Sequence, residues 1–302
     1  MTEPESAVRA GMPGGRAVLA GRDVPRMGFG AMQLPGPGVL GPPADRAQAL
    51  AVLRRAVELG VRHVDTAQYY GPDVSNELIA AALRPYPADL VLVSKVGARR
   101  DERGAWLEAQ RPEELRAGVE ANLRSLRIEQ VPVVNLRRQP DADVPFAEQV
   151  DAMVALCGAG LVGAMGLSNV TLEQYRQARS VTDVACVQNP YNLTQRGEQP
   201  LLEACAADGV PFVPFFPLGS AFGSDNPVLG HPEVRAAADD LGATPAQVAL
   251  AWLLHQSPSV LLIPGTSSVA HLEENVAAAD LVLDEDLLRA LDAAGQGGAA
   301  VG

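Results

Sequence analysis

The chain of 302 residues contains only three cysteines, Cys157, Cys186 and Cys205, and no two of them have CxxC spacing. This odd number argues against a disulfide scaffold and a cysteine-built zinc site, and it favours a reducing compartment. Basic residues are also scarce. The chain has 24 Lys and Arg but 36 Asp and Glu, which gives a net charge of −12. Nucleic acid is not the expected partner, since neutralising phosphates requires a surplus of positive charge.

Long apolar runs are missing as well. No segment reaches the roughly 18 uninterrupted apolar residues of a membrane span. The first residues lack a positive region followed by an apolar run, so no secretory signal is predicted. We therefore expect a cytoplasmic protein without a membrane partner. Residues 1–16 and 296–302 are predicted to be flexible tails around a single domain at 17–295, and nothing suggests an interface, so a monomer is expected.

The chain does contain a regular alternation of short apolar runs and amphipathic segments. A hairpin is predicted around Gly21, between Val18 and Val24. Strands are predicted at 27–32, 61–65, 90–95, 131–136, 161–168, 184–188, 211–216 and 260–265. Helices are predicted at 47–59, 76–83, 112–126, 146–157, 172–178, 200–207, 245–255 and 270–278. Eight such βα units favour a closed barrel over a doubly wound sheet, which has about five or six strands. The fold class is therefore α/β, a (β/α)8 TIM barrel with an N-terminal β-hairpin.

Polar residues stand at the ends of several predicted strands, where the active site of such a barrel lies. Asp65, Tyr70 and Lys95 form a coherent proton-transfer unit. An ammonium near a phenol favours the phenolate and lowers the tyrosine pKa from about 10, and a carboxylate would hold the lysine in place. The same three residues also fit a buried ion pair with a tyrosine packed beside it.

Several motifs in order, GFGAM, DTAQYYG, VSK, GLSN, VQNPYN, PFFPLG and IPGTSSVAHLEEN, resemble the aldo-keto reductase superfamily over nearly the whole chain. The similarity is closest to its bacterial branch of pyridoxal reductases. The resemblance implies a tetrad in which Asp65, Tyr70 and Lys95 fill three positions and Tyr70 protonates the carbonyl oxygen as hydride arrives from nicotinamide. Arg137 stands where the fourth residue is usually histidine.

Arg137 has three readings. An arginine cannot act as a base, but its donors can polarise a carbonyl or steady a developing alkoxide. It can instead bind a phenolate or phosphate of the substrate, and pyridoxal carries a ring hydroxyl beside its aldehyde. A surface arginine paired with Asp141 or Asp143 is the structural alternative.

The resemblance also implies NADPH as cofactor. No metal is expected, because His63, His231 and His255 do not have the spacing of metal ligands. Phe215 is expected to stack on the nicotinamide, and residues 266–268 to hold the 2′-phosphate at a helix start. His271 replaces a basic residue common in the family, which leaves the strength of the NADPH preference open. The implied cofactor-binding residues are Ala31, Met32, Asp65, Ser168, Asn169, Gln188, Phe215, Phe216, Pro217, Leu218, Gly219, Ser220, Gly265, Thr266, Ser267, Ser268, His271, Glu274 and Asn275.

The implied activity is NADPH-dependent reduction of a small aldehyde or ketone to an alcohol, most specifically of pyridoxal to pyridoxine. Two alternatives stay open. One is a reductase of another small-molecule carbonyl, such as a sugar or a secondary-metabolite intermediate, because barrel loops set specificity independently of the strands. The other is a non-catalytic NADPH-binding redox sensor.

Overall fold

The computed structural model describes residues 14–101, 103–140, 142–219 and 226–296, so most of both expected tails lies outside the described residues. The described part opens with an antiparallel pair, β1 (Arg16–Leu19) and β2 (Arg22–Pro25). Ala20 and Gly21 between them both have positive φ, 49° and 74°. This is the backbone that a two-residue hairpin turn requires, because it matches the twist of the paired strands.

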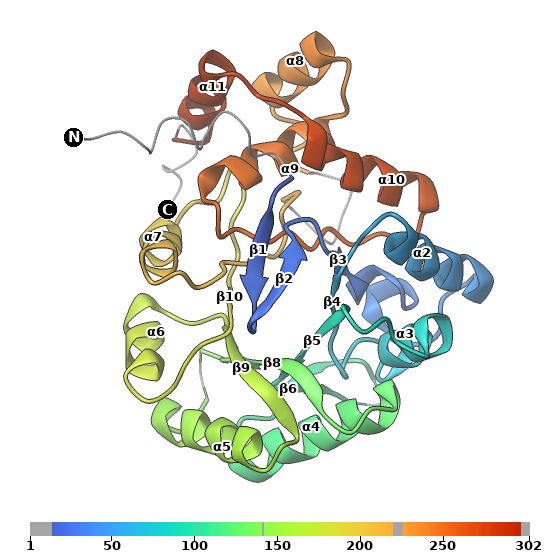
Figure 1. Ribbon diagram of the computed structural model, residues 1–302, viewed down its shortest axis with the longest axis vertical. Coiled ribbons are helices and arrows are strands. Elements are labelled where there is room, and N and C mark those ends of the chain that lie inside the picture. The colour runs from blue at the N-terminus through green and yellow to red at the C-terminus, as the bar shows by residue number, and fades with distance from the viewer. Residues whose placement is uncertain (1–13, 102, 141, 220–225, 297–302) are drawn as a thin grey trace.

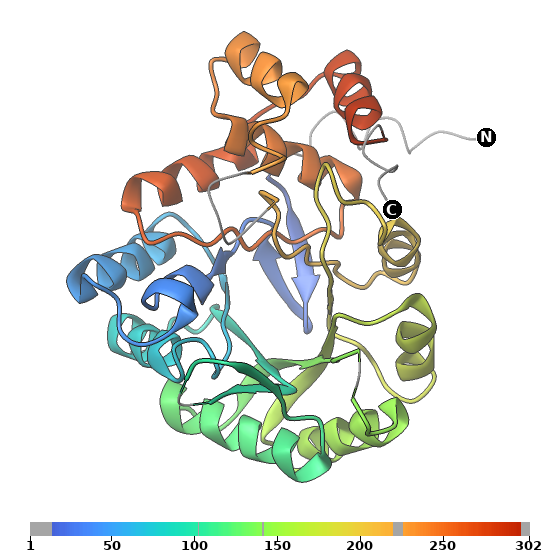
Figure 2. The same cartoon turned by 180° about the vertical axis from the view of Figure 1, so that it is seen from behind.

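A curled parallel sheet follows, in the order β10-β9-β8-β5-β4-β3. Its strands are β3 (Phe29–Gly30), β4 (His63–Asp65), β5 (Val91–Val96), β8 (Val131–Arg137), β9 (Val162–Ser168) and β10 (Val187–Gln188). Helices surround the strands in Figures 1 and 2. They are α2 (Arg46–Glu58), α3 (Val74–Leu83), α4 (Pro112–Leu126), α5 (Phe146–Gly158), α6 (Leu172–Arg179), α7 (Gln199–Ala207), α8 (Pro232–Leu241), α9 (Pro245–Gln256), α10 (Val269–Ala277) and α11 (Glu285–Gln296).

Five of the predicted strands are shorter or more irregular than expected, among them 61–65 and 184–188, which form only His63–Asp65 and Val187–Gln188. The segment 27–32 forms only the two-residue β3, and a 3-10 helix, Ala31–Gln33, follows it. The segments 211–216 and 260–265 form isolated parallel bridges, in which Phe212 pairs with Val187 and with Val260, and Leu262 pairs with Met27. Proline removes a ladder donor, and both of these segments contain it, which limits how far regular pairing extends.

Two α-helices and two strands among the described residues were not predicted. Helices α8 and α11 lie outside the expected alternation, and α11 ends close to the predicted tail. The strands β6 (Ala98–Arg100) and β7 (Trp106–Glu108) form a short antiparallel hairpin after β5. Each of these two strands has three residues, too few to show a period of two in the sequence. None of the helices in the described ranges is long and apolar enough to cross a membrane.

Alternation along the strands separates the two sides of the sheet. In β5, Val91 and Val93 pack in the interior cluster with the hairpin residues Leu19 and Val24. Lys95 is the next residue on the same side, because side chains repeat with a period of two. The hairpin therefore fills the end of the ring where the strands begin, and polar side chains occupy the end where they finish. In Figure 1 this hairpin lies across the middle of the ring.

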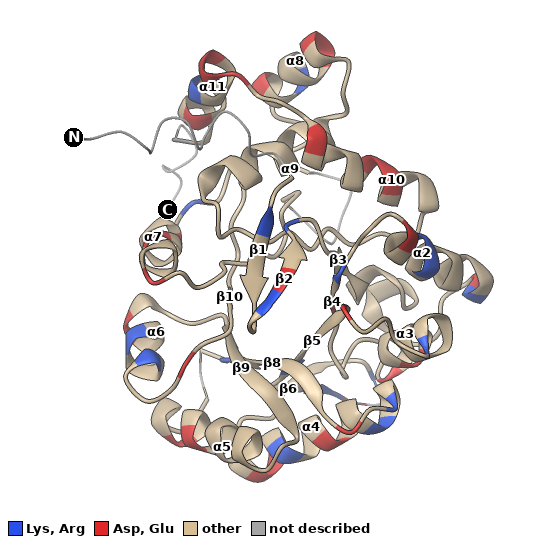
Figure 3. Ribbon diagram, in the orientation of Figure 1, with Lys and Arg blue, Asp and Glu red and all other residues tan. Residues whose placement is uncertain are grey.

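Most charged positions lie on the surrounding helices, as Figure 3 shows, and the strands are mainly uncharged. Arg26 is a charged residue that lies in the interior of the protein, where it is only 1% exposed. Its guanidinium donates to the carbonyl oxygens of Val260 at 3.0 Å and of Leu254 and Ser257 at 2.5 Å each. Burial lowers the Arg26 pKa to about 10, so the group stays charged at neutral pH. Arg26 thus ties the first strand segment to the last helix–strand unit of the ring.

Replacing Arg26 with methionine is expected to destabilise the protein by about 3 kcal/mol, because methionine keeps the apolar stem but leaves buried carbonyl oxygens without donors. Urea denaturation followed by circular dichroism measures this. Arg22→Met is the matched control, since Arg22 donates one exposed bond to the Ala88 carbonyl; we expect it to change stability by less than about 0.5 kcal/mol. Equal stabilities of the two variants would refute the role of Arg26.

Candidate active site

A buried ion pair lies at the carboxyl ends of β4 and β5. The Lys95 ammonium contacts the Asp65 carboxylate and donates to the Thr66 carbonyl oxygen at 3.0 Å. The amide of Gln188, from the end of β10, donates to the other oxygen of Asp65 at 2.9 Å. All four of these residues are at most 3% exposed. The carboxylate is therefore fully engaged by two groups, and the ammonium keeps a third donor for another partner.

Tyr70 stands beside this pair. The Lys95 Nζ atom is 5.1 Å from the centre of the Tyr70 ring, and the ring of Tyr69 packs edge-on against it. The Tyr70 carbonyl accepts from the Ser75 N–H at 3.2 Å at the start of α3. Strand β4, strand β5 and helix α3 therefore bring together the three tetrad residues expected from the sequence.

The direction of the Tyr70 pKa differs from the sequence-based expectation. Burial raises the pKa of Tyr70 well above its ordinary value, and the Asp65 carboxylate raises it further, while Arg137 acts in the opposite direction. The expected lowering by Lys95 does not dominate, because its charge is matched by Asp65 in the adjacent ion pair. Tyr70 is therefore a neutral phenol, which is a proton donor.

Arg137, at the end of β8, faces the same region. Its guanidinium carbon lies 5.9 Å from the centre of the Phe215 ring. Its Nε has no hydrogen-bond partner among the described residues, and no ion pair joins it to Asp143 there. Asp141 lies outside the described residues. The next residue, Arg138, points elsewhere and donates to the carbonyls of residues 142 and 144 at 3.3 and 3.4 Å.

A cavity of about 110 Å³ opens at this site. Nine of the predicted residues line it: Met32, Asp65, Tyr70, Gln188, Phe215, Phe216, Pro217, Leu218 and Gly265. The wall also includes Gly30, where an added Cβ would come within 2.5 Å of the Ile263 carbonyl oxygen. Close approach of these two neighbouring backbone segments in the cavity wall thus requires glycine.

Ser168 and Asn169 end β9 beside the cavity but do not line it. The Ser168 hydroxyl is fully buried and has no hydrogen-bond partner among the described residues. The Asn169 amide donates to the Arg138 carbonyl at 2.9 Å, and Asn169 has a positive φ of 58°. Phe216 also has a positive φ, 54°, which side chains of its kind rarely adopt. Strained backbone of this type clusters at functional sites.

The remaining predicted cofactor residues that the structure describes do not line this cavity. Ser268 caps α10 by accepting from the His271 N–H at 3.4 Å, and Thr266 accepts from the Ser268 N–H at 3.0 Å. His271 is exposed, Glu274 is half-buried and Asn275 is buried. Ser267 lines a second cavity of about 400 Å³ together with Met32 and the 34–39 loop. Ala31 is buried and Gly219 half-buried, and Ser220 lies outside the described residues.

Some residues near the site were not found from the sequence. Gln33 lines both cavities. Thr66 supplies an acceptor to Lys95, and its place directly after Asp65 in the DTA motif was a usable signal. Arg100 and Trp106, on the unpredicted β6–β7 hairpin, stack with 4.2 Å between the guanidinium and the indole ring. In the described ranges no three His, Cys, Asp or Glu side chains group as a metal site.

Comparison with known proteins identifies a matching family and a similar protein. A model of the aldo/keto reductase family matches residues 26–296. Pyridoxine 4-dehydrogenase of Escherichia coli (strain K12) is 49% identical over 279 residues, which cover 91% of this chain and 96% of that protein.

Two solved structures are similar as well. One is an aldo-keto reductase from Klebsiella pneumoniae in complex with NADPH, with a TM-score of 0.77, 29% identity, and coverage of 93% of this chain and 94% of that one. The other is an aldo/keto reductase from the same organism with NADP and acetate, with a TM-score of 0.77, 28% identity, and coverage of 92% and 94%.

The tyrosines of the chain generate a pH prediction. Burial raises the pKa of all five, including Tyr86 and Tyr191 to about 12. A pKa above the unfolded value of about 10 stabilises the fold below that pH, and this contribution is lost as pH rises through the folded values. Tyrosinate absorbance is therefore expected to appear together with the loss of the far-ultraviolet circular dichroism signal. Titration near pH 10 in a still-folded protein would contradict this, and urea-unfolded protein is the control.

Proposed function

The chain belongs to the aldo/keto reductase family, and from this premise we propose that it reduces pyridoxal to pyridoxine with Tyr70 as the proton donor. It is an NADP-dependent oxidoreductase. The observation that carries the finer proposal is the position of the Tyr70 phenol next to the buried Asp65–Lys95 pair, in a cavity that Phe215 also lines. The pyridoxine 4-dehydrogenase relative supports the choice of substrate.

NADPH, when bound, supplies the hydride that reaches the carbonyl carbon. The carbonyl oxygen gains negative charge in this step and takes the phenolic proton of Tyr70, so the product is an alcohol and Tyr70 becomes a phenolate. The Lys95 ammonium lies 5.1 Å from the centre of the Tyr70 ring, and Arg137 lowers the Tyr70 pKa, so both positive charges favour the phenolate that forms. Asp65 and Gln188 keep the ammonium in place.

The residues present fit the cofactor. The Ser168 hydroxyl is buried without a partner, which suits a ligand amide that supplies one. The Phe215 ring lines the cavity and offers a face for stacking. Residues 266–268 directly precede α10, whose first N–H groups favour an anion. We assign the nicotinamide end of NADPH to Ser168 and Phe215, and the 2′-phosphate end to residues 266–268.

Arg137 is proposed to recognise the ring hydroxyl of pyridoxal next to its aldehyde. A guanidinium presents two parallel N–H groups, and neighbouring carbonyl and phenolate oxygens match this fork. The free Nε and the position near Phe215 support this role. Arginine in place of the usual histidine therefore favours hydroxylated aromatic aldehydes as substrates.

The proposal includes a closed eight-stranded barrel. The parallel bridges from Val187 through Phe212 and Val260, and from Leu262 to Met27, support closure of the curled sheet between β10 and β3. The expected monomer also remains part of the proposal.

Replacing Tyr70 with phenylalanine is expected to lower kcat for pyridoxal by about 10²- to 10⁴-fold, because the proton donor is lost. NADPH consumption measures turnover, and quenching of NADPH fluorescence measures binding, which should persist. Tyr69→Phe is the matched control, since Tyr69 is buried beside Tyr70 but does not line the cavity. Turnover only on other aldehydes would replace the substrate. NADPH binding without turnover on any carbonyl would favour the redox sensor.

Replacing Arg137 with methionine is expected to lower kcat/KM for pyridoxal by about 10²-fold, the size of a lost charged hydrogen bond. Pyridine-4-carbaldehyde, which lacks the hydroxyl, should lose much less. Arg138→Met is the control, because that guanidinium points to the 142–144 loop. Equal losses on both aldehydes would assign Arg137 to carbonyl polarisation, and unchanged kinetics on both would refute any site role.

A further inference from the structure

Behind the strands that carry Asp65 and Lys95 lies a second polar layer, between β4, β5 and the helices α3 and α4. Two asparagines form its centre, Asn76 on α3 and Asn122 on α4, and both are completely buried. We propose that this asparagine pair positions the Lys95 ammonium from outside the sheet. This inference rests on the proposed function, in which Lys95 acts on Tyr70.

Asn122 holds strand β5 at two consecutive residues. Its Oδ1 accepts from the Ser94 hydroxyl at 2.5 Å, and its Nδ2 donates to the Lys95 carbonyl oxygen at 3.4 Å. The Nδ2 also donates to the Gly118 carbonyl within α4 at 2.9 Å. Ser94 points toward the helices because Lys95, its neighbour, points into the ring. Asn122 thus fixes the backbone from which the Lys95 side chain extends.

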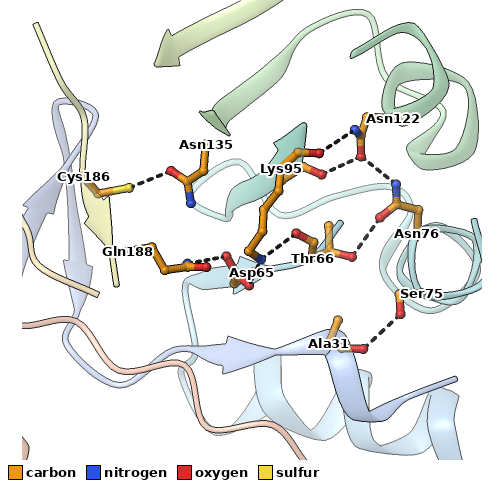
Figure 4. A network of polar contacts seen from close by, with 11 residues as sticks. Ala31, Asp65, Thr66, Ser75, Asn76, Lys95, Asn122, Asn135, Cys186 and Gln188 are labelled. Carbon is orange, nitrogen blue, oxygen red and sulfur yellow. Dashed lines mark hydrogen bonds and ion pairs between the residues drawn. The ribbon is translucent and has the colours of Figure 1, made fainter. Parts of the chain in front are cut away.

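Asn76 holds the other end of the same lysine. The Thr66 hydroxyl donates to the Asn76 Oδ1 at 2.8 Å, and the Asn76 Nδ2 donates to the Asn122 Oδ1 at 2.9 Å. Thr66 is the residue whose carbonyl accepts from the Lys95 ammonium at 3.0 Å. Figure 4 shows the chain of contacts from Thr66 through Asn76 to Asn122 and back to Lys95. The lysine is therefore anchored at its backbone and at its tip by one connected network.

The directions of these hydrogen bonds make the network specific. Each asparagine uses its oxygen only as an acceptor and its nitrogen only as a donor, so neither amide can flip without facing like against like. A buried polar network that is fully satisfied defines one arrangement, whereas a partly satisfied one is costly. Apolar side chains would fill the same space, but they would not define where the Thr66 carbonyl stands.

A further contact links the same helix start to the cofactor side. The Ser75 hydroxyl donates to the Ala31 carbonyl at 3.0 Å, while its N–H donates to the Tyr70 carbonyl. The first turn of α3 therefore contacts the segments of Ala31, Thr66 and Tyr70 through two neighbouring residues. The start of α3 therefore supports the proton donor Tyr70, the Thr66 segment that binds the lysine ammonium, and the predicted cofactor residue Ala31.

Thr66→Val is the sharpest test, because it keeps the shape and removes the hydroxyl that donates to Asn76. We expect kcat to fall about 10- to 100-fold, as small misplacements near the reacting groups do, with KM for NADPH changed less than about twofold. Thr66→Ser restores the hydroxyl and should restore kcat. Ser125→Ala is the matched control, since Ser125 accepts from Asn76 at 3.0 Å but contacts neither strand residue. It should lower the melting temperature and leave kcat unchanged.

A second readout needs no substrate, because Lys95 is the only lysine of the 302 residues. Protein labelled with 15N-lysine therefore gives one side-chain ammonium signal. In Thr66→Val we expect this signal to shift and its protons to exchange faster with water, and in Thr66→Ser and Ser125→Ala to match the wild type. If Thr66→Val does not fold, Ser94→Ala takes its place, since it removes the hydroxyl of β5 that donates to Asn122, and a shift of the same signal is expected.

The outcomes separate the two proposals. If the ammonium signal shifts in Thr66→Val but the wild type reduces no carbonyl, the positioning role is supported and the reductase is refuted. An unmoved signal with unchanged kcat in Thr66→Val would overturn the positioning role and leave the reductase intact. An equal shift in Ser125→Ala would also overturn it, because the ammonium signal would then respond to any change between the helices and not to the contact from Thr66.

Discussion

A buried ammonium constrains the rest of this structure. Lys95 is 2% exposed, and a charge at such a depth is stable only with a close counter-charge and further hydrogen bonds. Asp65 from the neighbouring strand, the Thr66 carbonyl and, through Asp65, Gln188 from β10 meet that demand. Strands β4, β5 and β10 must therefore keep one register, because a slip by one residue would turn each of these side chains to the other face.

The two ends of the parallel strands have different roles. At the starting ends the β1–β2 hairpin fills the interior with Leu19 and Val24, and this apolar packing holds the strands together. At the finishing ends the interior is polar, and the cavity is lined by glycine backbone, Tyr70 and Phe215. Arg26 joins the first and last units where regular strand pairing is reduced to single bridges. Stability and chemistry are thus placed at opposite ends of the same strands.

The candidate site could be predicted largely from motifs, because its residues follow strands at fixed spacing. Asp65, Tyr70 and Lys95 do lie together, and nine of the predicted residues line one cavity. The positions that the sequence did not reveal are those whose role depends on neighbours distant in sequence. The hairpin that carries Trp106 has strands too short to show periodicity, and the supporting asparagines look like ordinary polar residues of amphipathic helices.

The sequence by itself determined the local elements and the chemistry available. Helix α4 has the predicted bounds, Pro112–Leu126, since a proline at its start and acidic first-turn residues are local signals. Only the tertiary structure decided the direction of the Tyr70 pKa. Desolvation depends on how deeply the surrounding elements bury the phenol, and the influence of Lys95 depends on its pairing with Asp65. The tertiary structure likewise brought Asn76 and Asn122 to the backs of the strands, because those contacts span 10 to 46 residues of chain.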